Sequence, residues 1–302
     1  MATAWLFPGQ GSQAVGMGVD LNTLEAAQAK FKQAAAILGW SVLEVCESEE
    51  EKLSQTRYTQ PCLYVIEAIL ADLLKAQSQQ QPQFVAGHSL GEYVALYAAG
   101  VFDFETGLKL VKQRAEVMSQ ASGGKMVALM GFKRDQLNAG IENNPDVVIA
   151  NDNNETQVVI SGTPAAVDAL LENVKVRRAI PLKVSGAFHS PLMSQAAQEF
   201  EAILADVNFV EAQIPVISNV DPNPSTEATV LKQRLVQQMT GSVRWREIML
   251  QLADSEVKKA VEVGPGQVLS GLLKRSQPAI ERFNVGTVED LKALSNEELT
   301  HA

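Results

Sequence analysis

Short apolar segments alternate with longer amphipathic ones along much of the chain, a pattern that predicts strands followed by helices. The run TAWLF (3–7) predicts a strand, and residues 29–39 predict a helix that ends at a glycine. Apolar positions in 58–77 recur with a period near 3.6, which predicts a long helix. Residues 82–100 combine a short apolar strand, a tight Gly-Ser-Gly turn and another helix. This alternation favours a parallel sheet covered by helices on both faces.

The pattern changes after residue 124, where the order becomes strand, helix, strand, strand, helix, strand. These segments are MVALMGF (126–132), 133–143, DVVIAND (146–152), QVVISG (157–162), 163–174 and RAIPLKVSG (178–186). A βαββαβ order is typical of ferredoxin-like domains, so we expect residues 125–186 to form a small inserted domain. The chain then returns to helices, with two further strand candidates at 214–220 and 258–264.

Composition narrows the class of protein without identifying it. The 302 residues are 46% hydrophobic and 20% charged, which is ordinary for a globular protein. With 35 acidic and 25 basic residues the net charge is −10, which argues against binding to nucleic acid. Cys46 and Cys62 fit no metal-ligand spacing and are expected to be free thiols. We see neither a signal peptide nor an apolar run near the roughly 18 residues of a membrane span, so we expect an intracellular protein.

A glycine-rich loop, FPGQGSQ (7–13), follows the first predicted strand. A phosphate-binding P-loop would end in Gly-Lys-Ser/Thr, yet the first lysine after this loop is Lys30. The dinucleotide fingerprint would need a glycine where the chain has Ala14. Both nucleotide interpretations therefore fail, and the loop is either a structural turn or an approach for backbone N–H groups to another ligand.

The hexapeptide GHSLGE (87–92) contains the Gly-x-Ser-x-Gly pattern between an apolar strand and a helix, which is typical of a nucleophile elbow. Glycines permit the strained turn that would expose the hydroxyl of Ser89. The backbone N–H of Leu90 would then lie at a helix N-terminus and face a developing oxyanion. The alternative is a plain tight turn.

A serine nucleophile needs a base, and the chain offers three histidines, His88, His189 and His301. His301 is the penultimate residue, and neighbouring side chains at such a turn point apart, which disfavours His88. His189, in GAFHSPLM, follows the predicted insertion and is the preferred base, although a lone histidine is often structural. No acid stands out as its partner, and a backbone carbonyl can hold the imidazole instead.

Arg114 lies at the edge of the apolar stripe of a predicted helix at 104–120. One interpretation is a surface arginine whose stem covers apolar neighbours. The other is a guanidinium that faces a cleft and holds a carboxylate through two parallel hydrogen bonds.

Together these stretches resemble the malonyl-CoA:acyl carrier protein transacylases of fatty-acid synthesis and the acyltransferase domains of polyketide synthases. The resemblance spans almost the whole chain, in order, through FPGQGSQ, GHSLGE, QRAEVM, GAFHSPLM, VRW and EVGPGQVLSGLLKR. It implies an α/β class fold: a hydrolase-like catalytic core with a mainly parallel sheet, formed by residues 1–124 and 187–302, and a ferredoxin-like insertion at 125–186.

The resemblance also implies roles for individual residues. Ser89 would be the nucleophile and His189 the base, while the backbone N–H groups of Gln10 and Leu90 would form the oxyanion hole. Arg114 would pair with the free carboxylate of the malonyl group.

Three further residues are implied around this centre. The main-chain carbonyl of Gln238 would orient His189, and Asn154 would line the acyl pocket. Phe188 would occupy the space that a branching methyl group needs, which favours malonyl over methylmalonyl substrates.

The function implied is a ping-pong transfer of malonyl from malonyl-CoA to the phosphopantetheine thiol of acyl carrier protein. It would supply fatty-acid or polyketide synthesis and need no metal or redox cofactor. We expect a monomer in the cytoplasm, or in a plastid or another compartment of fatty-acid synthesis, bound to neither membrane nor nucleic acid. Docking of an acidic carrier would need a local basic patch, with these candidates: Lys112, Lys183, Arg244, Arg246, Lys274 and Arg275.

Two other functions remain open at this point. A serine esterase or thioesterase would share the elbow and the histidine but use water as the acceptor, and it would have no need of a buried Arg114. A non-catalytic acyl-binding relative would be expected to have lost Ser89, His189 or Arg114, and all three are present.

Overall fold

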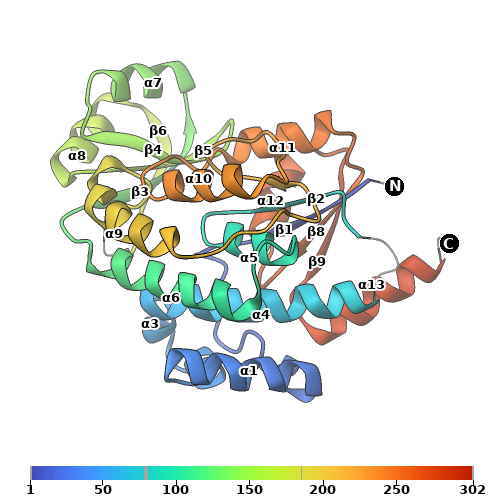
Figure 1. The fold of residues 1–302 in the computed structure, drawn as a ribbon. Coiled ribbons are helices and arrows are strands. Elements are labelled where there is room, and N and C mark those ends of the chain that lie inside the picture. The colour runs from blue at the N-terminus through green and yellow to red at the C-terminus, as the bar shows by residue number, and fades with distance from the viewer. Residues whose placement is uncertain (1, 78–80, 185, 301–302) are drawn as a thin grey trace.

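The computed structural model describes residues 2–77, 81–184 and 186–300, and a five-stranded parallel sheet forms its centre (Figure 1). The strand order is β7-β2-β1-β8-β9, and every neighbouring pair is parallel. The bounds are β1 (Thr3–Phe7), β2 (Phe84–Gly87), β7 (Val216–Ile217), β8 (Lys259–Val263) and β9 (Glu281–Val285). The predicted α/β core with a mainly parallel sheet is confirmed.

Helices cover both faces of this sheet because alternate residues of β1 point to opposite sides. Ala4 and Leu6 pack with α11 and α12 in one apolar cluster, whereas Trp5 and Phe7 belong to a second cluster with α4 and α5. The helices of the main body are α1 (Glu25–Leu38), α2 (Val42–Cys46), α3 (Glu50–Leu53), α4 (Thr56–Gln77), α5 (Gly91–Ala98), α6 (Phe104–Gln120), α9 (Ser194–Ala205), α10 (Ala228–Gln238), α11 (Trp245–Asp254), α12 (Val268–Ser276) and α13 (Val288–Thr300), with short 3-10 turns at η1 (Asp20–Thr23) and η2 (Pro191–Met193).

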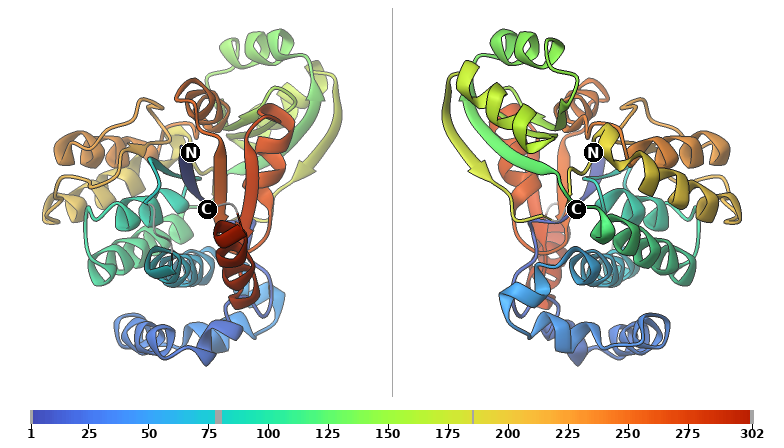
Figure 2. Two further views of the ribbon diagram at one scale, coloured as in Figure 1. Left: turned by 90° about the vertical axis from the view of Figure 1, so that its right-hand side faces the viewer. Right: turned by 90° about the vertical axis from the view of Figure 1, so that its left-hand side faces the viewer.

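A second, antiparallel sheet has the order β4-β5-β3-β6, which is the ferredoxin-like arrangement expected for a βαββαβ unit. Its elements are β3 (Lys125–Phe132), α7 (Arg134–Glu142), β4 (Val147–Asn154), β5 (Gln157–Gly162), α8 (Pro164–Asn173) and β6 (Val176–Pro181). Val127 and Leu129 pack under α7 and α8, while Met126 and Ala128 join the main core. Figure 2 shows this unit at the opposite end of the molecule from α1. The domain limits 125–186 stay a prediction.

Two strand predictions were wrong in detail, and one strand was not predicted. Only Val216 and Ile217 form a strand within 214–220, and the strand predicted at 178–186 runs instead from Val176 to Pro181. The edge strand β9 was missed altogether, because its exposed and half-buried residues give only a weak apolar signal. The helix predicted at 29–39 does end at Gly39, which adopts a left-handed conformation with φ 83°.

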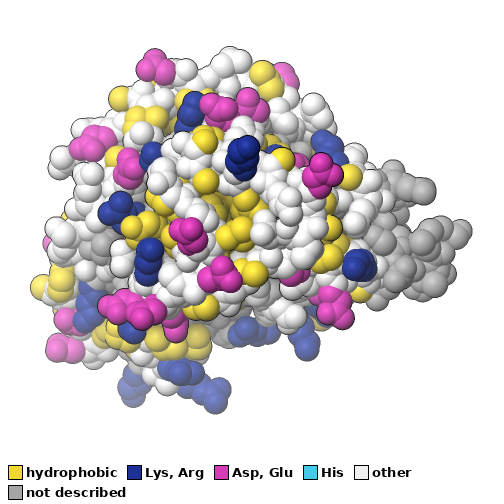
Figure 3. Space-filling model, turned by 90° about the horizontal axis from the view of Figure 1, so that it is seen from below, with side chains coloured by type: hydrophobic (Ala, Val, Ile, Leu, Met, Phe, Trp, Pro, Cys, Tyr) yellow, Lys and Arg dark blue, Asp and Glu magenta, His cyan; other side chains and the backbone are white. Residues whose placement is uncertain are grey.

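The described surface is mixed in character. Seen from below, where α1 lies, hydrophobic side chains gather in the middle of the face and charged side chains of both signs surround them (Figure 3). No helix in the described part of the chain is long and apolar enough to cross a membrane.

Candidate active site

The site begins where two neighbouring parallel strands end. Phe7 of β1 is paired with Gly87 of β2, so the loops that follow both strands leave the same edge of the sheet. They lie so close that a Cβ at Gly9 would come within 2.3 Å of the His88 carbonyl oxygen. A Cβ at Gly91 would lie 2.0 Å from the carbonyl oxygen of Phe7. Gly9 and Gly91 are therefore required by the close contact between the two segments.

Ser89 occupies the sharp turn between β2 and α5 with φ 52°, a left-handed conformation that is strained for a residue with a side chain. Its Oγ lies 2.8 Å from Nε2 of His189, which is itself left-handed with φ 57°. The structure therefore brings the predicted nucleophile and the predicted base into hydrogen-bond contact across 100 residues of sequence.

His189 is buried, 4% exposed, and two backbone carbonyls face its other ring nitrogen. Nδ1 lies 2.9 Å from the carbonyl oxygen of Gln238 and 3.2 Å from that of Gly241. Because carbonyl oxygens only accept, Nδ1 carries the proton and Nε2 is free to accept the hydroxyl proton of Ser89. Burial, reinforced by the charge of Arg114, lowers the pKa of His189 to about 3, so the resting imidazole is neutral.

Two backbone N–H groups are available next to the hydroxyl of Ser89. Within the described chain, neither the N–H of Gln10 nor that of Leu90 has a hydrogen-bond partner. Leu90 stands at the N-terminus of α5, where the helix dipole adds a partial positive charge. Gln10 also lines a cleft of about 1110 Å³ whose wall includes Arg57 and Lys183. This arrangement suits the stabilisation of a negatively charged oxygen.

Arg114 is 1% exposed, which excludes the interpretation as a surface arginine. Its Nη1 donates to Gln60 Oε1 at 2.7 Å, and its Nη2 donates to Ser89 Oγ at 3.1 Å and to Gln238 Oε1 at 3.0 Å. Its guanidinium also lies over the ring of Tyr93, 5.2 Å from the centroid. Burial lowers its pKa from the usual value. No carboxylate of the described residues forms an ion pair with Arg114.

Other predicted residues lie farther from this contact. Phe188 is buried in the main apolar cluster, and Asn154 is buried with its Oδ1 accepting from the backbone and hydroxyl of Thr156. Their roles toward an acyl group stay predictions. His88 points away from the hydroxyl, with Nε2 3.0 Å from Oδ1 of Asn153. His301 lies outside the described residues.

Sequence reasoning missed three buried residues that contact the site: Gln60, Glu92 and Asn219. Glu92 was visible as the last residue of GHSLGE, and Asn219 lies at the carboxyl end of the strand predicted at 214–220. A polar residue at the carboxyl end of such a strand is a signal that could have identified Asn219.

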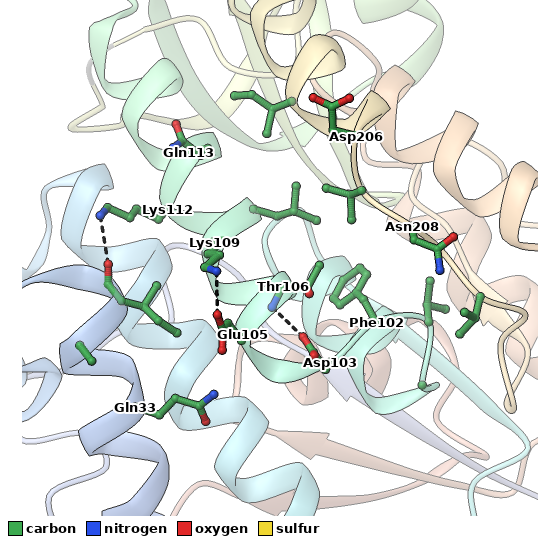
Figure 4. A pocket seen from close by; sticks show the side chains of 18 residues that line it. Gln33, Phe102, Asp103, Glu105, Thr106, Lys109, Lys112, Gln113, Asp206 and Asn208 are labelled. Atoms are coloured by element: carbon green, nitrogen blue, oxygen red, sulfur yellow. Dashed lines mark hydrogen bonds and ion pairs between the residues drawn. The ribbon is translucent and has the colours of Figure 1, made fainter.

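A separate cavity is not part of this site. About 1290 Å³ lies between α1, α6 and the segment after α9, with Phe102 and Asn208 on its wall (Figure 4). Among its polar side chains, Lys109 pairs with Glu105, and Lys112 donates to the backbone carbonyl of Ile37. The described residues contain no cluster of histidine, cysteine and carboxylate side chains placed to hold a metal ion.

Comparison with known proteins gives a consistent match. The model of the acyl transferase domain matches residues 4–289. The malonyl CoA-acyl carrier protein transacylase of Synechocystis sp. is 60% identical over 294 residues, which cover 97% of this chain and all of the relative. A polyketide biosynthesis malonyl CoA-acyl carrier protein transacylase of Bacillus subtilis is 44% identical, over 90% of this chain and 96% of the relative.

Solved structures agree with the sequence matches. The crystal structure of the Synechocystis malonyl-CoA:ACP transacylase superposes with a TM-score of 0.95 at 59% identity, covering 97% of this chain and all of that one. A malonyl-transacylase solved in complex with its type II polyketide acyl-carrier protein has a TM-score of 0.93 at 32% identity, covering 98% of this chain and all of that one.

Proposed function

The chain belongs to the acyl transferase domain family, and from that membership we propose how its site residues divide the reaction. Its activity is that of a malonyl-CoA:acyl carrier protein transacylase, an acyltransferase that moves malonyl from coenzyme A to the carrier. Supply of fatty-acid or polyketide synthesis is consistent with both kinds of relative.

In the first half-reaction Ser89 attacks the thioester carbonyl of malonyl-CoA. His189 Nε2 takes the hydroxyl proton, and the carbonyl oxygen becomes an oxyanion that accepts from the N–H groups of Gln10 and Leu90. When the carbon–sulfur bond breaks, the imidazolium returns the proton to the sulfur of coenzyme A. Malonyl remains as an ester on Ser89.

The second half-reaction runs the same steps in reverse. His189 deprotonates the phosphopantetheine thiol of acyl carrier protein, whose sulfur attacks the malonyl ester. Collapse of the second oxyanion breaks the ester bond, and the oxygen of Ser89 recovers the proton. On the protein side, every step uses groups of one copy of this chain, so the proposed reaction needs neither a second protomer nor a metal or redox cofactor. The bacterial origin of the relatives supports a cytoplasmic enzyme.

The observation that carries this assignment is the buried charge of Arg114. All its protein partners are neutral oxygens, and its Nε has no partner among the described residues. Glu92 is the buried acidic group that interacts with this charge, but it forms no ion pair with Arg114. A buried cation without a direct ion-pair partner is costly, and a carboxylate delivered by the substrate relieves that cost. A malonyl group whose carbonyl carbon lies at Ser89 carries its free carboxylate two bonds farther on, close enough for Arg114 to hold it.

Intact-protein mass spectrometry tests the proposal directly. Incubation with malonyl-CoA should add one malonyl group, and peptide mapping should place it on Ser89. Ser89→Ala should show no mass gain. Rapid loss of the malonyl group to water, with no faster transfer when carrier protein is added, would favour the thioesterase alternative.

The carrier should dock on cations that the protein leaves unpaired. Arg244 and Arg246 form ion pairs with acidic neighbours, which weakens them as candidates. Lys183, Lys274 and Arg275 form no ion pair with the described residues, and Lys183 lines the cleft beside Gln10. Lys183→Glu and Arg275→Glu should raise the KM for carrier protein and leave the KM for malonyl-CoA unchanged.

Arg246→Glu serves as the matched charge reversal. If it affects carrier transfer as strongly as the Lys183 and Arg275 variants, docking does not depend on the unpaired cations.

A further inference from the structure

The side chain of Asn219 forms hydrogen bonds with the backbone of the nucleophile elbow at Ser89 and at Gly87. It is fully buried, two residues beyond β7. Its Oδ1 accepts the backbone N–H of Ser89 at 2.7 Å, and its Nδ2 donates to the carbonyl oxygen of Gly87 at 2.6 Å. β7 pairs with β2 only through Val216 and Ile217. Backbone pairing between β7 and β2 therefore stops before the turn. Beyond that point the side-chain amide of Asn219 provides the next two hydrogen bonds to the β2 segment.

These two hydrogen bonds act where the backbone is strained. A left-handed conformation such as that of Ser89 costs roughly 1–2 kcal/mol for a residue with a Cβ. Without Asn219, the Ser89 N–H and the Gly87 carbonyl would lose these partners, and rotation of the turn would relieve the strain. That rotation would move the hydroxyl away from His189 and turn the N–H of Leu90 out of the oxyanion position.

Glu92 connects this amide to the segment that holds the base. Its Oε2 accepts the backbone N–H of Asn219 at 3.1 Å and Nε2 of Gln238 at 2.7 Å. The same Nε2 lies 3.0 Å from the carbonyl oxygen of Ser89, and the Gln238 carbonyl binds Nδ1 of His189. The buried side chain of Glu92 thus links Asn219, which bonds the Ser89 backbone, to Gln238, which bonds His189.

We propose that Asn219 is a positioning residue for the acyl transfer: its side-chain amide fixes the backbone of Ser89 in the reactive conformation, and Glu92 fixes that amide relative to Gln238. This inference rests on the proposed function, since it assigns Asn219 to the same nucleophile. Among the described residues Asn219 forms no hydrogen bond with Arg114 and reaches it only through Glu92 and Gln238, so its loss should affect the chemical step more than the binding of the malonyl carboxylate.

The first test is Asn219→Ala, with Asn284→Ala as the matched control. Asn284 also makes two side-chain hydrogen bonds, from β9 to Glu262 and Ser270, without touching the site. A displacement of the nucleophile by about 1 Å can cost around 100-fold in rate. Asn219→Ala should therefore lower kcat for malonyl transfer about 100-fold, with KM for malonyl-CoA within twofold of wild type. Asn284→Ala should keep the wild-type kcat.

The second test is Asn219→Asp, which distinguishes positioning from a general loss of stability. A protonated carboxyl group can still accept from Ser89 and donate to Gly87, whereas an ionised one cannot donate. The activity of this variant relative to wild type should therefore rise as the pH is lowered within the folded range. If Asn219→Ala does not fold, this pH profile decides the question.

Two results would overturn the assignment: a folded Asn219→Ala enzyme with kcat within threefold of wild type, or a ratio of Asn219→Asp to wild-type activity that does not change with pH. Failure of the proposed function is a different result. In that case wild-type protein itself forms no malonyl-serine, and the positioning role fails with it.

Discussion

Replacing Arg114 by alanine should separate the transfer of malonyl from the transfer of acetyl. The substitution removes a buried guanidinium that bonds Gln60, Ser89 and Gln238. Malonyl brings a carboxylate that needs this cation, whereas acetyl has only a methyl group at the same place. Malonyl transfer therefore measures the loss of the cation that holds the carboxylate, whereas acetyl transfer measures only the remaining effect of the substitution on activity.

The expected losses of activity follow from the burial of Arg114. Removing one partner of a buried ion pair costs about 3–5 kcal/mol, which corresponds to roughly 10²-fold to several 10³-fold in kcat/KM for malonyl-CoA. Acetyl transfer loses only the hydrogen bond from Nη2 to Oγ of Ser89, about 1 kcal/mol or a few-fold in rate. The ratio of malonyl to acetyl transfer should thus fall by at least about tenfold.

The assay measures kcat/KM for malonyl-CoA and acetyl-CoA with the same carrier protein, beside a thermal melt. The melt is needed because Oε1 of Gln60 and Oε1 of Gln238 both lose a buried donor. Arg114→Lys keeps the charge but cannot form two parallel hydrogen bonds, so its malonyl activity should lie between wild type and Arg114→Ala. Equal losses for both acyl groups in a folded Arg114→Ala enzyme would refute the pairing of Arg114 with the carboxylate.

Three other predictions concern stability and selectivity. The pKa of His189, about 3 when folded, lies below the unfolded value near 6.5; stability should therefore fall as pH drops from about 6.5 toward 3, and urea unfolding of His189→Gln should show a weaker pH dependence. Gly91→Ala would force a Cβ against the Phe7 carbonyl and should lower the free energy of unfolding by at least about 1–3 kcal/mol, with loss of activity. Gly271→Ala lies on a helix where a Cβ meets no close neighbour, and it should stabilise the protein by about 0.5–1 kcal/mol in thermal melts. Phe188→Leu should lower the preference for malonyl-CoA over methylmalonyl-CoA in competition assays by roughly tenfold, and an unchanged ratio would remove Phe188 from the acyl pocket.

Local signals in the sequence predicted the elements that carry the reaction. The glycine-rich loop, the elbow around Ser89 and the short apolar run of β1 are properties of neighbouring residues, and each was recognisable alone. His189 could be chosen among three histidines by elimination. The helix periodicity left Arg114 undecided, because its burial depends on Gln60 and Gln238, which come from other helices.

Pairings between distant segments could not be predicted in the same way. Asn219 lies 130 residues beyond Ser89, and its role depends on β7 lying beside β2 rather than at another edge of the sheet. The extent of β7 was overestimated because apolar Val220 stands at the end of the predicted segment 214–220, although pairing with β2 ends at Ile217 and the backbone of Asn219 already bonds Glu92. Sequence patterns indicate which segments are strands, but the order of the strands decides which side chains meet.

The short distances around Ser89 also connect binding to chemistry. Nη2 of Arg114 and Nε2 of His189 both contact the same Oγ, so in the proposed mechanism the proton that His189 accepts places a second positive charge beside the first. The charge of Arg114 already lowers the pKa of His189. A malonyl carboxylate on Arg114 neutralises that charge and makes the imidazolium easier to form, whereas an acetyl group leaves it in place. Selectivity for malonyl should therefore be expressed in kcat as well as in KM, because the substrate that binds correctly also strengthens the base that activates its nucleophile.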